Sequence, residues 1–309
     1  MAQSNKSVFS IFMEGFGIYT KHFPVFLKYM SFPVLGQIAG FALSLILPLW
    51  LAPVIVVAVG DEKLAFAITM LLSLPGIILF TKAFWEYLVA YVSVCSMAEN
   101  TVKSGRIYDI NAHKKVATMS KRVGSFVTLW LLFGVFTIVA ILPPMWFFAA
   151  IIFVFISLIF QVFTFEKNLS AAECFKKSFM LVKTNFWGTL LLLLIVGISS
   201  YFLLPKAIEI ILGILQITKL FIMVLDPVIS SYLPIEQWNL ALVALNVSEM
   251  ITSLEISKMI ISSVISCLVI YFTLPLRSIC FTLWYKQLSV NEIKSKSKKK
   301  KAKSEDVQV

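Results

Sequence analysis

The sequence predicts an all-α membrane protein, a six-helix transmembrane bundle with amphipathic helices in the cytoplasmic interface. Of its 309 residues, 59% are hydrophobic and 14% are charged, whereas soluble domains average about 45–50% and about 25%. Six apolar runs are long enough to cross a bilayer, since each crossing needs about 20 residues. A soluble globular fold is therefore excluded.

The six membrane spans follow from the positions of these apolar runs. We expect them at about 27–59, 64–94, 126–142, 145–165, 186–204 and 259–285. Several are longer than a bilayer requires, and proline explains the excess by bending the helix. Pro48 and Pro53 lie in the first span, Pro75 in the second and Pro275 in the last.

The orientation follows from the lysines and arginines between the spans, because positive residues are retained on the cytoplasmic side. Such residues concentrate in alternate segments, around 1–28, 95–125, 166–185 and 286–309. The opposite set holds only Lys63, Lys206, Lys219 and Lys258. We therefore expect both termini in the cytoplasm, with the first span acting as an uncleaved insertion signal.

The long outer segment, 205–258, has two readings. Its apolar stretches at 208–225 and 238–254 are interrupted by polar residues. These stretches are consistent with amphipathic helices in the outer interface, which is the interpretation we favour. They are also consistent with a re-entrant or spanning hairpin that turns at Asp226 and Pro227. Two extra spans would leave both termini inside, so the charge asymmetry does not decide between the two.

Three cytoplasmic segments place apolar residues at spacing 4-3-4, one face of a helix, just before a span. These stripes are Phe12, Phe16, Tyr19 and Phe23; Ala112, Val116, Met119 and Val123; and Phe175, Phe179, Val182 and Phe186. The candidate headgroup contacts beside them are Lys114, Lys115, Lys121, Arg122, Lys176, Lys177 and Lys183. The pattern indicates a threefold helix-plus-hairpin repeat.

The chain accordingly divides into three parts. Residues 1–25 form an N-terminal amphipathic helix, 26–290 form the transmembrane bundle, and 291–309 form a cytoplasmic tail. The tail carries seven lysines between Lys294 and Lys303. We expect it to be disordered and to associate with anionic headgroups.

The third amphipathic segment also carries a family resemblance. Residues 165–187 read FEKNLSAAECFKKSFMLVKTNFW, in which Ser170 and Glu173 have the spacing of a capping box. This stretch resembles one in bacterial integral membrane proteins related to the membrane domain of glycerophosphoryl diester phosphodiesterases. Residues 284–288 are similar to the closing Y-x-D-L stretch of that family but lack its acidic residue. The resemblance implies a free-standing six-helix domain in the bacterial cytoplasmic membrane, without the catalytic domain of the fused forms.

Residue sets for common catalytic mechanisms are missing from the sequence. It holds two histidines, His22 and His113, and no phosphate-binding loop, zinc-protease or serine-hydrolase pattern. The cysteines have no C-x-x-C spacing, and we expect free thiols at Cys95, Cys174, Cys267 and Cys280. We predict a non-enzymatic protein with no cofactor or metal.

Ionisable residues within spans are functional candidates by default. Lys82 and Glu86 are spaced i,i+4 near the inner end of the second span. They fit an ion pair at the interface, or a gate or substrate site. Arg277 lies in the last span, within expected reach of Glu86 or of a lipid phosphate.

Small residues form stripes on two spans. Gly36, Gly40 and Ser44 share one face of the first span, and Ser262 and Ser266 share one face of the last. Such stripes let helix backbones approach closely. They indicate packing within the bundle or, alternatively, formation of a homo-oligomer.

The leading hypothesis is a non-enzymatic membrane protein that organises or senses the cytoplasmic leaflet or scaffolds membrane partners. Its expected partners are membrane lipids, preferentially with anionic headgroups, and no specific nucleic acid. The alternative is a transporter or channel for a small solute or lipid, whose pathway uses Lys82, Glu86 and Arg277.

Overall fold

The computed structural model describes residues 6–107, 110–244 and 250–305, with the side chains of 120, 241 and 294 onward left out. Nearly all of these residues are helical, and no strand occurs among them. The stretches long and apolar enough to span a membrane are Phe23–Val59, Glu62–Ser104, Lys121–Ala140, Pro143–Phe165, Phe186–Ile214 and Ser253–Ile293. The expected class, an all-α multi-pass membrane protein, is confirmed.

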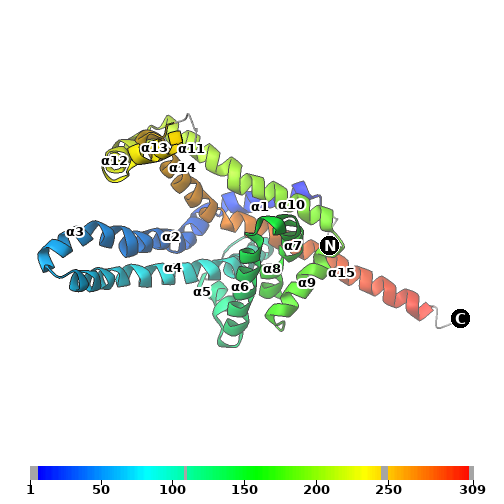
Figure 1. Ribbon diagram of the computed structural model, residues 1–309. Helices are drawn as coiled ribbons and strands as arrows, with labels where there is room; N and C mark the ends of the chain where they lie inside the picture. Colours follow the sequence, from blue (N-terminus) through cyan, green and yellow to red (C-terminus); the bar gives the residue numbers. More distant parts are fainter. Residues whose placement is uncertain (1–5, 108–109, 245–249, 306–309) are drawn as a thin grey trace. The chain divides into compact units, whose positions relative to one another are not determined.

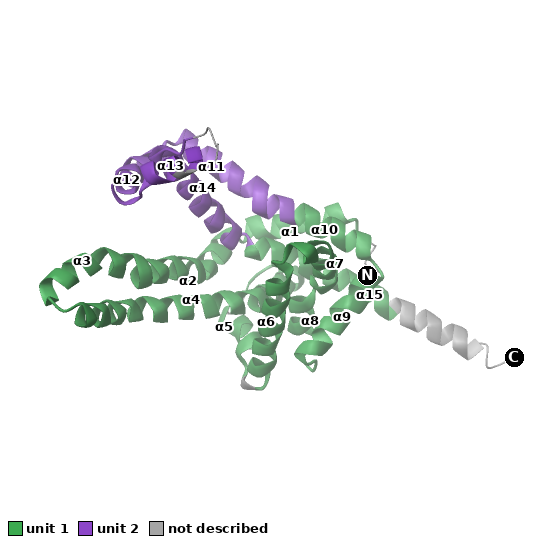
Figure 2. Cartoon of the chain, in the orientation of Figure 1, with its two compact units in different colours: residues 1–196, 274–309 green, residues 197–273 purple. Residues whose placement is uncertain are grey.

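The chain forms two compact units, 1–196 with 274–309 and 197–273 (Figure 2). Unit 1 contains α1 (Val8–Lys21), α2 (Phe23–Phe41), η1 (Ala42–Ile46), α3 (Leu47–Val59), α4 (Glu62–Ser104), α5 (Ile110–Thr118), α6 (Ser120–Ala140), η2 (Pro143–Met145), α7 (Trp146–Ile156), α8 (Ile159–Phe165), α9 (Ala171–Lys183), most of α10 (Phe186–Ile198) and α15 (Leu274–Glu305). Unit 2 contains η3 (Ser199–Leu203), α11 (Leu204–Ile214), α12 (Ile217–Tyr232), α13 (Ile235–Ala244) and α14 (Ser253–Phe272).

The order of these helices follows the expected repeat. The amphipathic helices α1, α5 and α9 each come directly before a spanning stretch, as the course of the ribbon shows (Figure 1). At α9 the local chemistry is explicit: the Ser170 hydroxyl accepts from the Glu173 backbone, and the Glu173 carboxylate accepts from the Ser170 backbone N–H. The predicted capping box is confirmed.

The packed core of unit 1 surrounds the second half of α4. From Tyr87 to Thr101 most side chains of this helix are buried, whereas in its first half Leu71 and Ile78 are 64% and 67% exposed. An extensive apolar surface that no part of the protein covers marks contact with a membrane or with another protein. The first half of α4, paired with α2 and α3, therefore supplies lipid-facing surface, and the second half supplies the core.

The small-residue stripe of the first span packs inside this α2–α4 hairpin. A Cβ added at Gly36 would lie 2.8 Å from the Ala83 Cβ, and one added at Gly40 would lie 2.5 Å from the Phe80 backbone nitrogen. Facing them, a Cβ at Gly76 of α4 would lie 2.3 Å from the backbone nitrogen of Ser44. The stripe thus serves close approach within one chain, the first of the two interpretations drawn from the sequence.

Proline has different effects at its different positions. Pro48 follows the π-helical turn η1, and Pro275 lies at the start of α15, just after α14 ends. The expected bend at Pro75 is not accompanied by a break, since α4 continues through it as one helix. Neighbouring helices and local adjustments re-satisfy the backbone groups that proline frees within a membrane helix.

Two segments complete the comparison with the expected layout. In the outer segment, α12 and α13 meet at 72°, a geometry of a broken span or a re-entrant loop, so an interfacial position for this segment stays a prediction.

The tail differs from expectation: α15 continues as helix to Glu305, where we predicted disorder from residue 291. Lysine is a good helix former, and extending an existing helix avoids the cost of nucleation.

Candidate functional site

A cleft of about 500 Å³ lies in unit 1 between α4, α5, α8 and α15. Its polar lining consists of Ser96, Glu99, Thr164, Lys167, Tyr285, Lys286 and Ser289. The helices that form it are held by the core around α4, so the cleft is supported by the most tightly packed part of the unit.

Glu99 is the electrostatic centre of the cleft. Its carboxylate lies 2.8 Å from Lys286 Nζ of α15 and 2.9 Å from Lys103 Nζ of α4. Lys286 Nζ also lies 5.6 Å from the centre of the Phe165 ring, a cation–π contact. Two lysines share one carboxylate, and Lys167 at the rim adds another exposed cation. Among the lining residues Lys167 and Lys286 outnumber Glu99 by one positive charge, while Glu166, outside the lining, is hydrogen-bonded to Tyr285.

The two stretches that carry the family resemblance meet beside this cleft. The Phe165 and Tyr285 rings stack with centroids 5.3 Å apart, and the Tyr285 hydroxyl donates to Glu166 Oε1 over 3.1 Å. One residue earlier, Trp284 Nε1 donates to Thr189 Oγ1 over 2.9 Å in a buried position. These contacts fix the end of α8 and the first turn of α10 to α15.

Three of the seven candidate headgroup residues are held by protein groups instead. Lys114 Nζ lies 2.6 Å from Glu86, and Lys177 Nζ lies 2.7 Å from Glu292. Arg122 donates to the backbone carbonyls of Val116 and Phe163, with its guanidinium 4.1 Å from the centre of the Phe163 ring. We therefore assign these three to anchoring α5, α6 and α9, while Lys115, Lys121, Lys176 and Lys183 remain exposed.

The amphipathic helices also present a different face to the protein than the expected stripes. On α1 the buried residues are Ile11, Gly15 and Tyr19, and a Cβ at Gly15 would lie 2.5 Å from Cys280 Sγ of α15. Of the expected stripe only Tyr19 is buried; Phe23 is 40% exposed. Small residues allow the closest approach of two helices, and this selects the buried face.

The same rotation occurs on α5 and α9. His113 and Ala117 are buried on α5, where the expected stripe runs through Val116, while on α9 the buried set includes Cys174 and Ser178. Of the expected α9 stripe Val182 is fully buried, whereas the other expected apolar residues lie at the flank of this contact. Two of them, Met119 and Phe179, are 56% and 45% exposed. Each helix thus has one face on the protein and an apolar flank left uncovered.

The intramembrane ionisable residues are distributed differently from the expectation. Glu86 pairs with Lys114 of α5, so the expected Lys82–Glu86 pair is not formed. Lys82 is exposed, with Nζ 5.8 Å from the centre of the Phe32 ring. Arg277 is buried near the start of α15, at 9% exposure. The sequence did not indicate Glu99 and Lys286, because their partnership joins helices 187 residues apart.

Cysteine and histidine take structural positions. All four cysteines are free, and burial raises the pKa of the Cys174 thiol to about 11, so this thiol is protonated at neutral pH. His113 Nδ1 lies 2.9 Å from the Ser96 hydroxyl. Partial burial and the nearby Lys21 lower the pKa of His22. Within the described ranges, no three His, Cys, Asp or Glu side chains are grouped to hold a metal ion.

Comparison with known proteins adds nothing to this geometry. No family model matches the chain, and neither a curated protein nor a solved structure matches it at a significant level. The features of the chain that bear on function are the exposed cations of α5, α6 and α9 and the uncovered apolar flanks beside them.

Proposed function

We propose that this chain is a non-enzymatic protein of the bacterial cytoplasmic membrane that organises or senses anionic lipids of the cytoplasmic leaflet. We place both termini in the cytoplasm and regard the chain as a relative of the membrane domain of glycerophosphoryl diester phosphodiesterases. The lysine and arginine asymmetry between the spans supports this orientation. The resemblance of residues 165–187 to that family supports the relationship.

The observation that carries the proposal is the outer face of α9. Phe179 and Met180 are 45% and 46% exposed, and Lys176 and Lys183 are exposed on the same helix. Apolar side chains beside cations are typical of a helix at the boundary between acyl chains and anionic headgroups. Lys177 pairs with Glu292 of α15, and the Ser178 hydroxyl donates to the Phe155 carbonyl of α7, so the helix that carries this face is held against the bundle.

A spin-label experiment on the whole protein tests this placement. A nitroxide is attached at Phe179→Cys or, as the matched control, at Lys176→Cys, both in a background with the exposed Cys267 replaced by serine. In vesicles containing phosphatidylglycerol, the label at 179 is expected to be accessible to oxygen and the label at 176 to a water-soluble nickel complex. A label at 179 that only the nickel complex reaches, or that neither reagent reaches, would contradict the proposal.

Reporter fusions test the proposed orientation independently. A reporter after Val309 should be active in the cytoplasm, and one inserted in the 142–144 turn should be active outside, because the charge asymmetry supports this arrangement. The same fusions at 60 and 107 serve as internal controls of opposite sign. An external C-terminal reporter would overturn the topology.

Transport of a small solute or lipid is the second candidate function, and Arg277 is the observation that favours it. A buried arginine in a spanning helix is costly and often marks a pathway. Reconstituted vesicles should then show flux that Arg277→Gln abolishes and that Lys63→Gln, at an exposed site outside this pathway, leaves intact. Vesicles without flux leave leaflet organisation as the function.

A further inference from the structure

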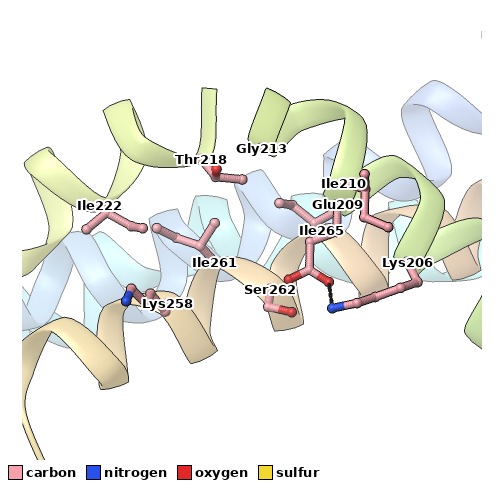
Figure 3. Close-up of a pocket in the computed structure, with 10 residues that line it drawn as sticks. All are labelled: Lys206, Glu209, Ile210, Gly213, Thr218, Ile222, Lys258, Ile261, Ser262 and Ile265. Carbon is pink, nitrogen blue, oxygen red and sulfur yellow. Dashed lines mark hydrogen bonds and ion pairs between the residues drawn. The ribbon is translucent and has the colours of Figure 1, made fainter. Parts of the chain in front are cut away.

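Unit 2 contains a hollow of about 360 Å³ between α11, α12 and α14. Its apolar wall is formed by isoleucines of all three helices, Ile210, Ile222, Ile261 and Ile265. Figure 3 shows these side chains converging on one side of the hollow. Its volume falls in the range of small-molecule pockets, about 300–1,000 Å³.

Charged and polar groups line the opposite edge. Lys206 Nζ lies 2.8 Å from the Glu209 carboxylate, which points toward Ser262, and Lys258 lies farther along the same edge (Figure 3). Among the lining residues Lys206 and Glu209 neutralise one another, and exposed Lys258 is the third charged group; Glu255, one turn earlier on α14 and outside the lining, interacts with it electrostatically. Along α14 the lining residues 258, 261, 262 and 265 recur at spacing 3-1-3, so they share one face of the helix.

This combination restricts the occupant. A polar solute would leave the isoleucine wall in contact with water, and a purely apolar molecule would leave Lys258 without an anion. A phospholipid satisfies both halves, because its phosphate meets the cation while an acyl chain covers the apolar wall. A zwitterionic lipid would bring a second cation next to Lys258, the one lining charge without a partner in the lining, so the lining favours a net negative headgroup.

We propose that this hollow is a binding site for one anionic phospholipid, with its phosphate at Lys258 and Ser262 and an acyl chain against Ile261 and Ile222. The site lies where the last two spans meet the outer segment, because Lys258 is five residues after Ser253, the first residue of α14. In the orientation proposed above it takes a lipid of the external leaflet. The inference does not depend on the cytoplasmic helices, because the lining belongs entirely to unit 2.

Native mass spectrometry of the full-length protein in detergent tests the site. The delipidated protein is titrated with phosphatidylglycerol or with phosphatidylcholine of the same acyl chains. One phosphatidylglycerol should bind, with phosphatidylcholine at least several-fold weaker. Lys258→Gln should weaken phosphatidylglycerol binding about fivefold, which corresponds to one lysine near a headgroup. Lys219→Gln, an exposed lysine of α12 outside the lining, is the matched control and should stay within twofold.

A second variant tests the apolar wall. Ile222→Trp fills the hollow from α12 and should reduce phosphatidylglycerol binding at least tenfold, and Ile222→Phe replaces it if tryptophan lowers thermal stability. Equal loss with Lys258→Gln and Lys219→Gln would indicate general surface attraction and overturn the site. So would unchanged binding in the filled variant. Neither result bears on the label accessibility at Phe179, so the two proposals fail separately.

Discussion

The closest helix contact in the first hairpin yields a sharp stability prediction at Gly40. An alanine Cβ there would lie 2.5 Å from the backbone nitrogen and 2.7 Å from the Cα of Phe80. Both are backbone atoms within α4, so neither can rotate away as a side chain does. To reach an ordinary contact of 3.4 Å, α2 and α4 must separate by about 0.9 Å at this point.

The energetic cost of that separation follows from packing. A gap of about 0.5–1 Å forfeits a quarter to a half of the dispersion energy of the atoms facing it. Overpacking of this kind typically costs about 1–3 kcal/mol. Replacing glycine within a helix also stabilises it by about 0.5–1 kcal/mol through backbone entropy. Gly40→Ala should therefore lower the free energy of unfolding, by less than the packing cost alone.

Gly134→Ala supplies the matched control, because a Cβ at Gly134 of α6 meets no atom within 4 Å. It keeps the entropy gain without the clash and should leave stability unchanged or higher. Unfolding of both variants in mixed micelles, followed by tryptophan fluorescence, should separate them by about 1–3 kcal/mol. Spin labels on α2 and α4 should move apart only in Gly40→Ala. Equal stability of the two variants would refute the close contact.

Two further predictions concern α15, which carries Trp284, and α9, the third amphipathic helix, which begins after Ser170. Trp284→Phe removes the buried bond to Thr189 and should lower the free energy of unfolding by about 1–3 kcal/mol, whereas Trp187→Phe, at a 77% exposed position, should change it little. Ser170→Ala should cost about 1 kcal/mol at neutral pH. Hydrogen bonds from Ser170 lower the pKa of Glu173 from its usual 4.5, so this contribution holds above pH 4.5 and is lost as the pH falls through the lowered value. Stability measured at both ends of that range should show the Ser170→Ala difference shrinking in acid by the part due to the hydroxyl bond to Glu173, while the part due to the Glu173 N–H bond to Ser170 Oγ persists; a constant difference would contradict a contribution from the hydroxyl bond.

The sequence by itself determined the class, the spans and one helix start. Apolar run length is fixed by bilayer thickness, so the six spans appear as local patterns. The capping box at Ser170 is equally local, since both of its partners lie within four residues. The glycine stripe at Gly36 and Gly40 likewise indicated a close contact between two helices, although the sequence did not show which helix would be the partner.

Only the tertiary structure decided which residues meet. The amphipathic stripes mark an apolar half of each helix, but Gly15 facing Cys280 sets which part of that half is buried. The sequence did not determine which lysine pairs with which carboxylate, because any cytoplasmic cation is electrostatically suited to any carboxylate. Glu99 takes Lys286, 187 residues away, because packing around α4 brings α15 alongside. Charge determines which type of residue can pair with a carboxylate, and the packing of the helices determines which residue of that type lies close enough to do so.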